Sequence, residues 1–278
     1  MIARALPAAL LLASAGAWAQ TVPPRPASAR PAPATWTLQI GFAPVYSPVW
    51  QGSREMALSV FPDLRVNYKD SVFFSVPDGL GWNAVNRDGW RVGPLVKPRF
   101  GRDEGTGGSP FLITGGDDAL RGLGNVGTSG EAGGFVQKSF GPGRRWRART
   151  ELRQGFGGHS GVIGDAVIGY GDRQGRFLYN IAARATWADS AFTNTFFGVD
   201  AAQSVRSGLP VSQLASGIVS YGLGSTIVRP LNARSSLTLL TSYERLGDTV
   251  ADSSLVRDRG RRDQFTVGLA YGYRFTCN

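Results

Sequence analysis

Residues 263–275 alternate between two kinds of side chain at almost every position. One set is apolar or aromatic: Phe265, Val267, Leu269, Tyr271, Tyr273 and Phe275. The other set is polar or small: Gln264, Thr266, Gly268, Ala270, Gly272 and Arg274. Because successive side chains of a strand point to opposite faces, this segment is predicted to be a strand with one apolar and one polar face.

The same alternation recurs along the chain and predicts about twelve strands. They are expected near residues 36–42, 64–68, 72–76, 79–85, 90–100, 131–140, 145–153, 162–170, 176–187, 214–228, 234–243 and 263–275. Pro94 and Pro98 interrupt one of them, and since proline removes a ladder donor they indicate a bulge or a poorly paired stretch.

The connections between these strands alternate in length. Short ones rich in turn residues are expected at 69–71, 86–89, 141–144, 171–175 and 229–232. Long ones are expected at 47–62, 101–130, 188–213 and 246–262. An outer-membrane barrel has short turns on its periplasmic side and long loops outside, so the lengths predict an up-and-down barrel.

The N-terminus indicates export. Residues 1–19 have a basic start, a short apolar run and the A-x-A site Ala17-Trp18-Ala19, which predicts a signal peptide cleaved before Gln20. Residues 20–34 are rich in proline, alanine and arginine, and we expect a flexible arm that reaches about 40 Å at ~3.1 Å per residue. No later segment approaches the ~18 apolar residues of a membrane-spanning helix. Residues 35–278 are therefore expected to form one all-β, transmembrane antiparallel β-barrel in the outer membrane of a Gram-negative bacterium.

The net charge indicates which partners to expect, and the cysteine count excludes an internal disulfide. The net charge of +10 would suit nucleic acid, but an exported protein rarely meets it, so lipopolysaccharide, murein carboxylates or anionic solutes are the expected partners. Cys277 is the only cysteine, so the chain forms no internal disulfide.

Two sets of residues are candidates for the outer and inner faces. Aromatic side chains at strand ends predict the girdles that mark the membrane interfaces. These are Trp36, Trp90, Phe177, Trp187, Phe265, Tyr273 and Phe275. The opposite face predicts a basic lumen that attracts anions, joined clearly only by the acids Glu151, Asp165 and Glu244. Its basic residues are Arg91, Lys97, Arg99, Arg145, Arg147, Arg149, Arg153, Arg176 and Arg184. An internal network of salt bridges is the alternative for this face.

An ordered series of short segments resembles the MipA/OmpV family of outer-membrane proteins. The segments are QGS at 51–53, FPDLRVNY at 61–68, VFF at 72–74, RVGPL at 91–95, FGR at 100–102, LRGLG at 120–124, GEAG at 130–133, GHSG at 158–161, FFGV at 196–199 and SGLP at 207–210. The resemblance implies a barrel that acts as a scaffold for a murein transglycosylase and a murein synthase, or a general porin or adhesion-associated protein. It implies no catalytic residue. Barrels usually end on an aromatic residue, whereas Thr276, Cys277 and Asn278 follow Phe275 here.

Three motifs resemble known catalytic or binding sites, but their surroundings in this chain do not suit such a role. Residues 122–127 match G-x-G-x-x-G but lack the strand and helix that a dinucleotide site requires. His159 and Ser160 are adjacent, and on a strand adjacent side chains point apart, which disfavours a lipid hydrolase. Acids at 103–104 and 117–118 suit a solvated surface better than a cation site. We therefore assign no catalytic residue, cofactor or metal.

The sequence thus predicts a non-enzymatic outer-membrane barrel. A scaffold for murein-processing enzymes is preferred, a small anion-leaning porin or adhesion-associated protein is the alternative, and a lipid hydrolase is a remote third. Oligomeric state is not predicted.

Overall fold

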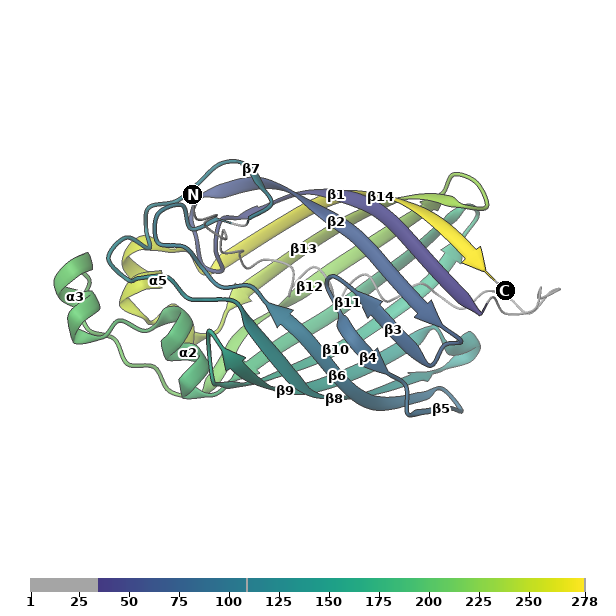
Figure 1. Ribbon diagram of the computed structural model, residues 1–278, viewed down its shortest axis with the longest axis horizontal. Coiled ribbons are helices and arrows are strands. Elements are labelled where there is room, and N and C mark those ends of the chain that lie inside the picture. The colour runs from purple at the N-terminus through teal and green to yellow at the C-terminus, as the bar shows by residue number, and fades with distance from the viewer. Residues whose placement is uncertain (1–34, 109, 278) are drawn as a thin grey trace, which may run out of the picture.

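The computed structural model describes residues 35–108 and 110–277, which form one antiparallel sheet (Figure 1). The predicted signal peptide and arm lie outside these residues. No described helix is long and apolar enough to cross a membrane. The strands are β1 (Trp36–Pro48), β2 (Met56–Tyr68), β3 (Val72–Ser75), β4 (Gly79–Trp82), β5 (Val85–Arg87), β6 (Trp90–Arg99), β7 (Leu112–Thr114), β8 (Ser129–Phe140), β9 (Trp146–Gly157), β10 (Val162–Gln174), β11 (Phe177–Ala188), β12 (Gly217–Pro230), β13 (Ser235–Leu246) and β14 (Asp263–Cys277).

Twelve of these strands close into a barrel. Each strand of the ring pairs with its neighbours, and β1 pairs with both β14 and β2. The two short strands β5 and β7 pair with β6 and β2 at the rim of this ring. Closure removes the exposed sheet edges that an open sheet would present. The prediction of a roughly twelve-stranded antiparallel barrel is confirmed.

Apolar side chains cover the outer face of this barrel. On β14, Phe265, Val267 and Leu269 are exposed, while Gln264 and Ala270 on the opposite face are buried. The same alternation places Leu223 and Ile181 outside on β12 and β11. An apolar outer band with a polar interior is the pattern that a lipid bilayer requires of a barrel.

The two ends of the barrel differ. The end that holds residues 36 and 277 carries the short turns and is called the short-turn end; the opposite, long-loop end carries the helices (Figure 1). The predicted long connection over 47–62 is wrong, because β1 and β2 leave only 49–55 between them. Val60 donates its N–H to Phe111 on the side of β2 away from β1. Proline has no N–H group, and the backbone nitrogen of Pro62 faces that same side of β2. Pro62 therefore removes no hydrogen bond between β2 and β1.

The part of the barrel wall between β2 and β6 consists of short strands with few paired residues. Here β3 and β4 have four residues each, and β4 pairs with β6 only at Leu95 and Val96. The other edge of β6 pairs with β8 along its whole length without a register shift. Pro94 and Pro98 therefore mark a stretch that is poorly paired on one edge rather than a bulge.

Three long connections, 100–128, 189–216 and 247–262, fold over the long-loop end together with the short connection 49–55. Their helices are α2 (Ser190–Phe197), α3 (Ala201–Ser207), α4 (Asp248–Ala251) and α5 (Ser254–Arg259). Asp189 begins α2 by accepting the N–H of Phe192, as a good N-cap does. The connections bury one hydrophobic core, which we call the cap core: Val49, Trp50, Leu120, Leu123, Phe192, Phe196, Phe197, Val199, Leu209, Val250, Ala251, Leu255 and Val256 together with apolar residues at the strand ends.

Gly41 is expected to be essential for the seam between β1 and β14. A Cβ atom at this position would lie 1.9 Å from the carbonyl oxygen of Tyr271. Gly41→Ala should therefore reduce the folded fraction severalfold in a refolding assay read by gel mobility of unheated samples. The matched control is Gly164→Ala, whose Cβ would meet nothing closer than 3.6 Å. Equal folding of the two variants would contradict the seam described here.

Candidate functional site in the barrel interior

The predicted girdle residues lie near the two ends of their strands. Trp36, Trp90 and Phe177 begin their strands at the short-turn end, and each is more than two-fifths exposed. Phe275 is also exposed at that end, and Tyr273 is half-buried beside it, with ring centroids 4.8 Å apart. Trp187 and Phe265 are exposed at the long-loop end. This placement fits two aromatic belts, and their role as membrane anchors stays a prediction.

A network of charged side chains lines the inner wall of the barrel from β6 through β8, β9 and β10 to β11. It consists of three acids and five cations: Glu131, Glu151, Asp165, Lys97, Arg99, Arg149, Arg153 and Arg184. We call this set the ion-pair network. All eight point to the same face because each occupies an inward position of its strand. Several are nearly inaccessible to solvent, so the charges are compensated by pairing rather than by water.

Arg153 is the centre of the ion-pair network. Its guanidinium lies 2.8 Å from Glu131 and 2.6 Å from Asp165, and it also bonds to Glu151. Its side chain is 1% exposed. The fork of an arginine presents five donors, which allows one side chain to serve three carboxylates on three neighbouring strands.

The other cations complete the network around these carboxylates. Arg99 pairs with Glu131, and Arg184 lies 2.6 Å from Asp165. Lys97 and Arg149 each lie 2.7 Å from Glu151. Within the network itself, five cations face three acids.

The acid content of the lumen is higher than the sequence pattern indicated. Glu131 is buried at the heart of the network, and Asp63 and Asp78 are buried on the inward side as well. Asp63 accepts from Gln39 at 2.7 Å and pairs with Arg65 at 2.8 Å. The salt-bridge network considered as the alternative for this face is present, and a lumen that attracts anions stays a prediction.

A cavity occupies the lumen at the short-turn end, and we call it the vestibule. Its volume is about 350 Å³. It is lined by the arginines Arg65, Arg91, Arg147, Arg149 and Arg274 and by Asp70, Asp78, Gln39, Asn67, Phe73, Phe74 and Gln137, among others. Of the remaining predicted lumen residues, Arg145 is half-exposed beside Asp172, and Arg176 is exposed in the turn before β11. The alternation placed them inward, but their positions at strand ends leave them at the mouth.

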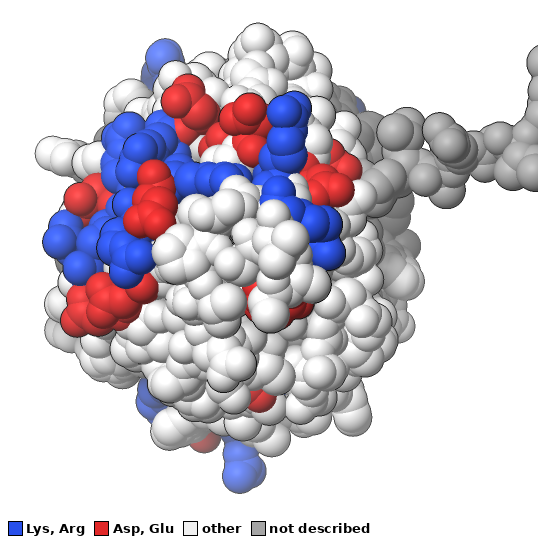
Figure 2. Space-filling model, turned by 90° about the vertical axis from the view of Figure 1, so that its left-hand side faces the viewer, with Lys and Arg blue, Asp and Glu red and all other residues white. Residues whose placement is uncertain are grey.

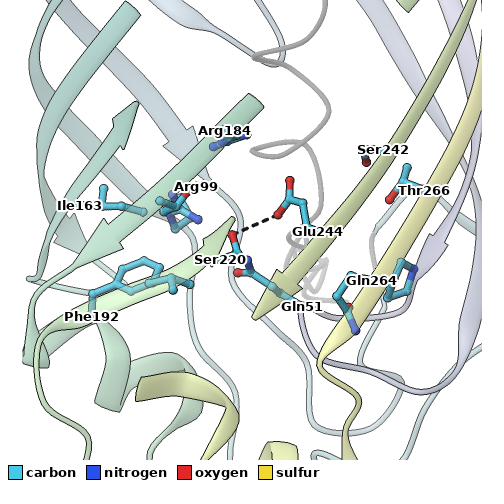
Figure 3. A pocket seen from close by; sticks show the side chains of 13 residues that line it. Gln51, Arg99, Ile163, Arg184, Phe192, Ser220, Ser242, Glu244, Gln264 and Thr266 are labelled. Carbon is cyan, nitrogen blue, oxygen red and sulfur yellow. Dashed lines mark hydrogen bonds between the residues drawn. The ribbon is translucent and has the colours of Figure 1, made fainter. Parts of the chain in front are cut away.

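The cap core separates the lumen from the solvent at the long-loop end. Figure 2 looks onto this end and shows loop side chains covering the mouth, with the charged ones gathered over one part of it. Below the cap lies a cavity of about 50 Å³, whose side chains Figure 3 shows converging from β11, β12, β13 and β14. There Ser220 donates to Glu244 at 3.1 Å. This space is large enough for water but not for a larger solute.

The side chain of His159 contacts the ion-pair network and does not pair with Ser160. Its ring nitrogen lies 3.2 Å from Glu131, and its ring stacks edge-on to Phe192 with centroids 5.2 Å apart. Ser160 is exposed, and no hydrogen bond joins the two side chains among the described residues. This contact is not predictable from the sequence pattern, because Glu131 and His159 lie on different segments that are far apart in the chain.

The remaining candidate motifs lie on the long-loop end. Backbone N–H groups of Gly122 and Gly124 donate to Glu104, so this glycine-rich loop binds its own carboxylate. Asp117 accepts from Trp50 and Ser53. Within the part of the chain that the structure describes, no group of three or more metal-ligating side chains gathers.

A closed antiparallel barrel with an apolar outer face, aromatic strand ends and a charged lumen defines a transmembrane β-barrel protein of the outer membrane. Residues 40–275 match the family model described as "MltA-interacting protein MipA". The chain belongs to this family.

Two curated relatives agree with this assignment. The outer membrane proteins Omp26La of Vibrio anguillarum and OmpV of Vibrio cholerae are each 31% identical over 93 residues. These matches cover 34% of this chain and only about a third, 34%, of each relative.

Solved structures show weaker likeness. The COG4313 outer membrane channel from Pseudomonas putida F1 matches with a TM-score of 0.46 and 14% identity over 91% of this chain and 100% of that chain. The NanC porin matches with a TM-score of 0.40 and 8% identity over 86% of this chain and 98% of its own. TM-scores of this size assign no function.

Proposed function

We propose that this chain is a non-enzymatic outer-membrane scaffold that holds murein-processing enzymes on its periplasmic side. The partners we propose are a murein transglycosylase and a murein synthase. The family description names an interaction with the transglycosylase MltA, and this supports the first partner. The proposed contacts are the short turns and residues 20–34 of the exported chain. Around the wall, outer-membrane lipids and lipopolysaccharide are the proposed neighbours.

The single observation that carries the proposal is the closed long-loop end. A pore needs a continuous polar path, and the cap core instead buries apolar side chains from four connections across the mouth. The short turns, in contrast, are polar and exposed: Lys69, Asp70, Asp88 and Arg144 all lie on the surface there. Short turns of such barrels face the periplasm, where murein is made and degraded.

Crosslinking in living cells tests the scaffold. Tagged protein is treated with a mild crosslinker, and captured proteins are identified by mass spectrometry. We expect a lytic transglycosylase or a murein synthase among them, with recovery reduced at least about tenfold by deleting residues 20–34. A control substitution, Val205→Lys, changes an exposed position of α3 at the opposite end and should leave recovery unchanged. Capture of only barrel-assembly factors and abundant neighbours would contradict the scaffold.

A small anion-leaning pore is the second candidate, and the vestibule favours it. Five arginines line this cavity against two aspartates, and low-dielectric walls focus such a field. For this candidate to hold, the cap must open, because its buried core blocks the path to the outside.

A further inference from the structure

The vestibule has the features of a binding site that is open to one side only. Its lining comes from the first residues of β1, β6 and β9, the last residues of β2, β8 and β14, and the short strand β3. Its inner limit is Arg149, where the ion-pair network begins. At about 350 Å³ it has the size of pockets that hold small molecules.

Arg65 pairs with Asp63 and Arg149 with Glu151, whereas two other arginines of the vestibule carry charge that no described acid compensates. Asp78 is engaged by the Ser75 hydroxyl at 2.5 Å, and Asp70 lies in an exposed turn. The side chains of Arg91 and Arg274 form no hydrogen bond or ion pair with any described residue. Arg91 and Arg149 occupy corresponding positions on either side of Gln137, so their charges lie close together on three adjacent strands. Like charges held together in a partly desolvated cavity attract an anion.

The chemistry of the lining points to carboxylates. A guanidinium donates two parallel N–H groups to the two oxygens of one carboxylate. Gln137 and Asn67 add amide groups suited to a peptide or hydroxyl group beside that carboxylate, and Phe73 adds an apolar face. We propose that the vestibule binds small carboxylate anions that enter from the periplasm. The proposal goes beyond the scaffold, because it holds for a barrel that captures no enzyme.

Two periplasmic sources carry this chemistry: free polycarboxylates and the peptide stems of murein. Calorimetric titration of the detergent-purified full chain therefore uses two probes, citrate and a disaccharide tetrapeptide released from murein. We expect at least one probe to bind, with affinity falling as salt rises. Tighter binding of the tetrapeptide assigns the site to murein, and equal or tighter binding of citrate assigns it to free carboxylates.

A pair of double variants locates the site. Arg91→Gln with Arg274→Gln should weaken binding at least about tenfold, since each removes a charged donor. Arg173→Gln with Arg176→Gln removes the same charge from an exposed turn at the same end and should leave binding within about twofold. Gel mobility of unheated samples confirms that both variants are folded. Absence of binding by either probe at 10 mM, on the order of the weakest useful affinity, or equal loss in both variants, would overturn the proposal.

Discussion

Replacing Arg153 by methionine is expected to lower the free energy of unfolding of the barrel by about 3 kcal/mol. Breaking a buried ion pair by removing one partner costs ~3–5 kcal/mol, because the remaining charge is left in a poorly solvated place. The lower end applies here, because Glu131, Glu151 and Asp165 each keep a second cation within reach. Methionine is shorter than arginine but has a similar volume, so little cavity energy is added. Urea unfolding of the refolded barrel measures the change.

Arg145→Met is the matched control for this prediction. Arg145 also pairs with an acid, Asp172 at 3.0 Å, but its side chain is half-exposed at the mouth. Solvent screens such a pair, so its loss should barely move the unfolding midpoint. Similar destabilisation by both variants would mean that water fills the lumen around Arg153 and that the network contributes no more than a surface pair.

Phe192→Ala is expected to loosen the cap without unfolding the wall. Phe192 is 1% exposed and contacts Phe196, His159 and Arg99. Truncating a buried phenylalanine costs ~3–5 kcal/mol, and here that loss falls on loops joined to the barrel only at strand ends. Trypsin added to intact cells should therefore cleave near Arg206 at least about tenfold faster, since cleavage follows the population of the open state.

The control for the cap is Val205→Ala on α3. Val205 is 87% exposed, so its truncation removes no buried contact and should leave the cleavage rate unchanged. If Phe192→Ala is cleaved no faster than this control, the loops are already open in the membrane. The interior would then be accessible from outside, contrary to the closed long-loop end.

The alternation of single strands made the barrel predictable from sequence. The strand β14 keeps polar and apolar residues apart, because one side meets lipid and the other the lumen. On β8 the signal is weak: Gly133 and Gly134 are adjacent, and Ala132 faces outward. Glu131 was therefore not assigned to the lumen. Its place follows from pairing with Lys97 of β6, a long-range register that a single strand does not reveal.

The cap was beyond prediction for a different reason. Its core gathers Trp50, Leu120, Phe197 and Leu255 from four separate connections. The contacts among these connections are long-range, and the pattern within any one segment does not reveal them. Alternation also carries no information on depth, which explains why Arg145 and Arg176 were grouped with Arg153 although they lie at the mouth. Depth depends on where the strands end.

Conductance of the purified full chain in a planar lipid bilayer tests most directly whether this barrel is closed to the outside. We expect insertion without steady channels in neutral salt, because the cap core covers the long-loop end and the ion-pair network occupies the lumen beside β6 to β11. Stable, ohmic, anion-selective channels from the unmodified protein would contradict it and would make the pore, rather than the scaffold, the function of this chain.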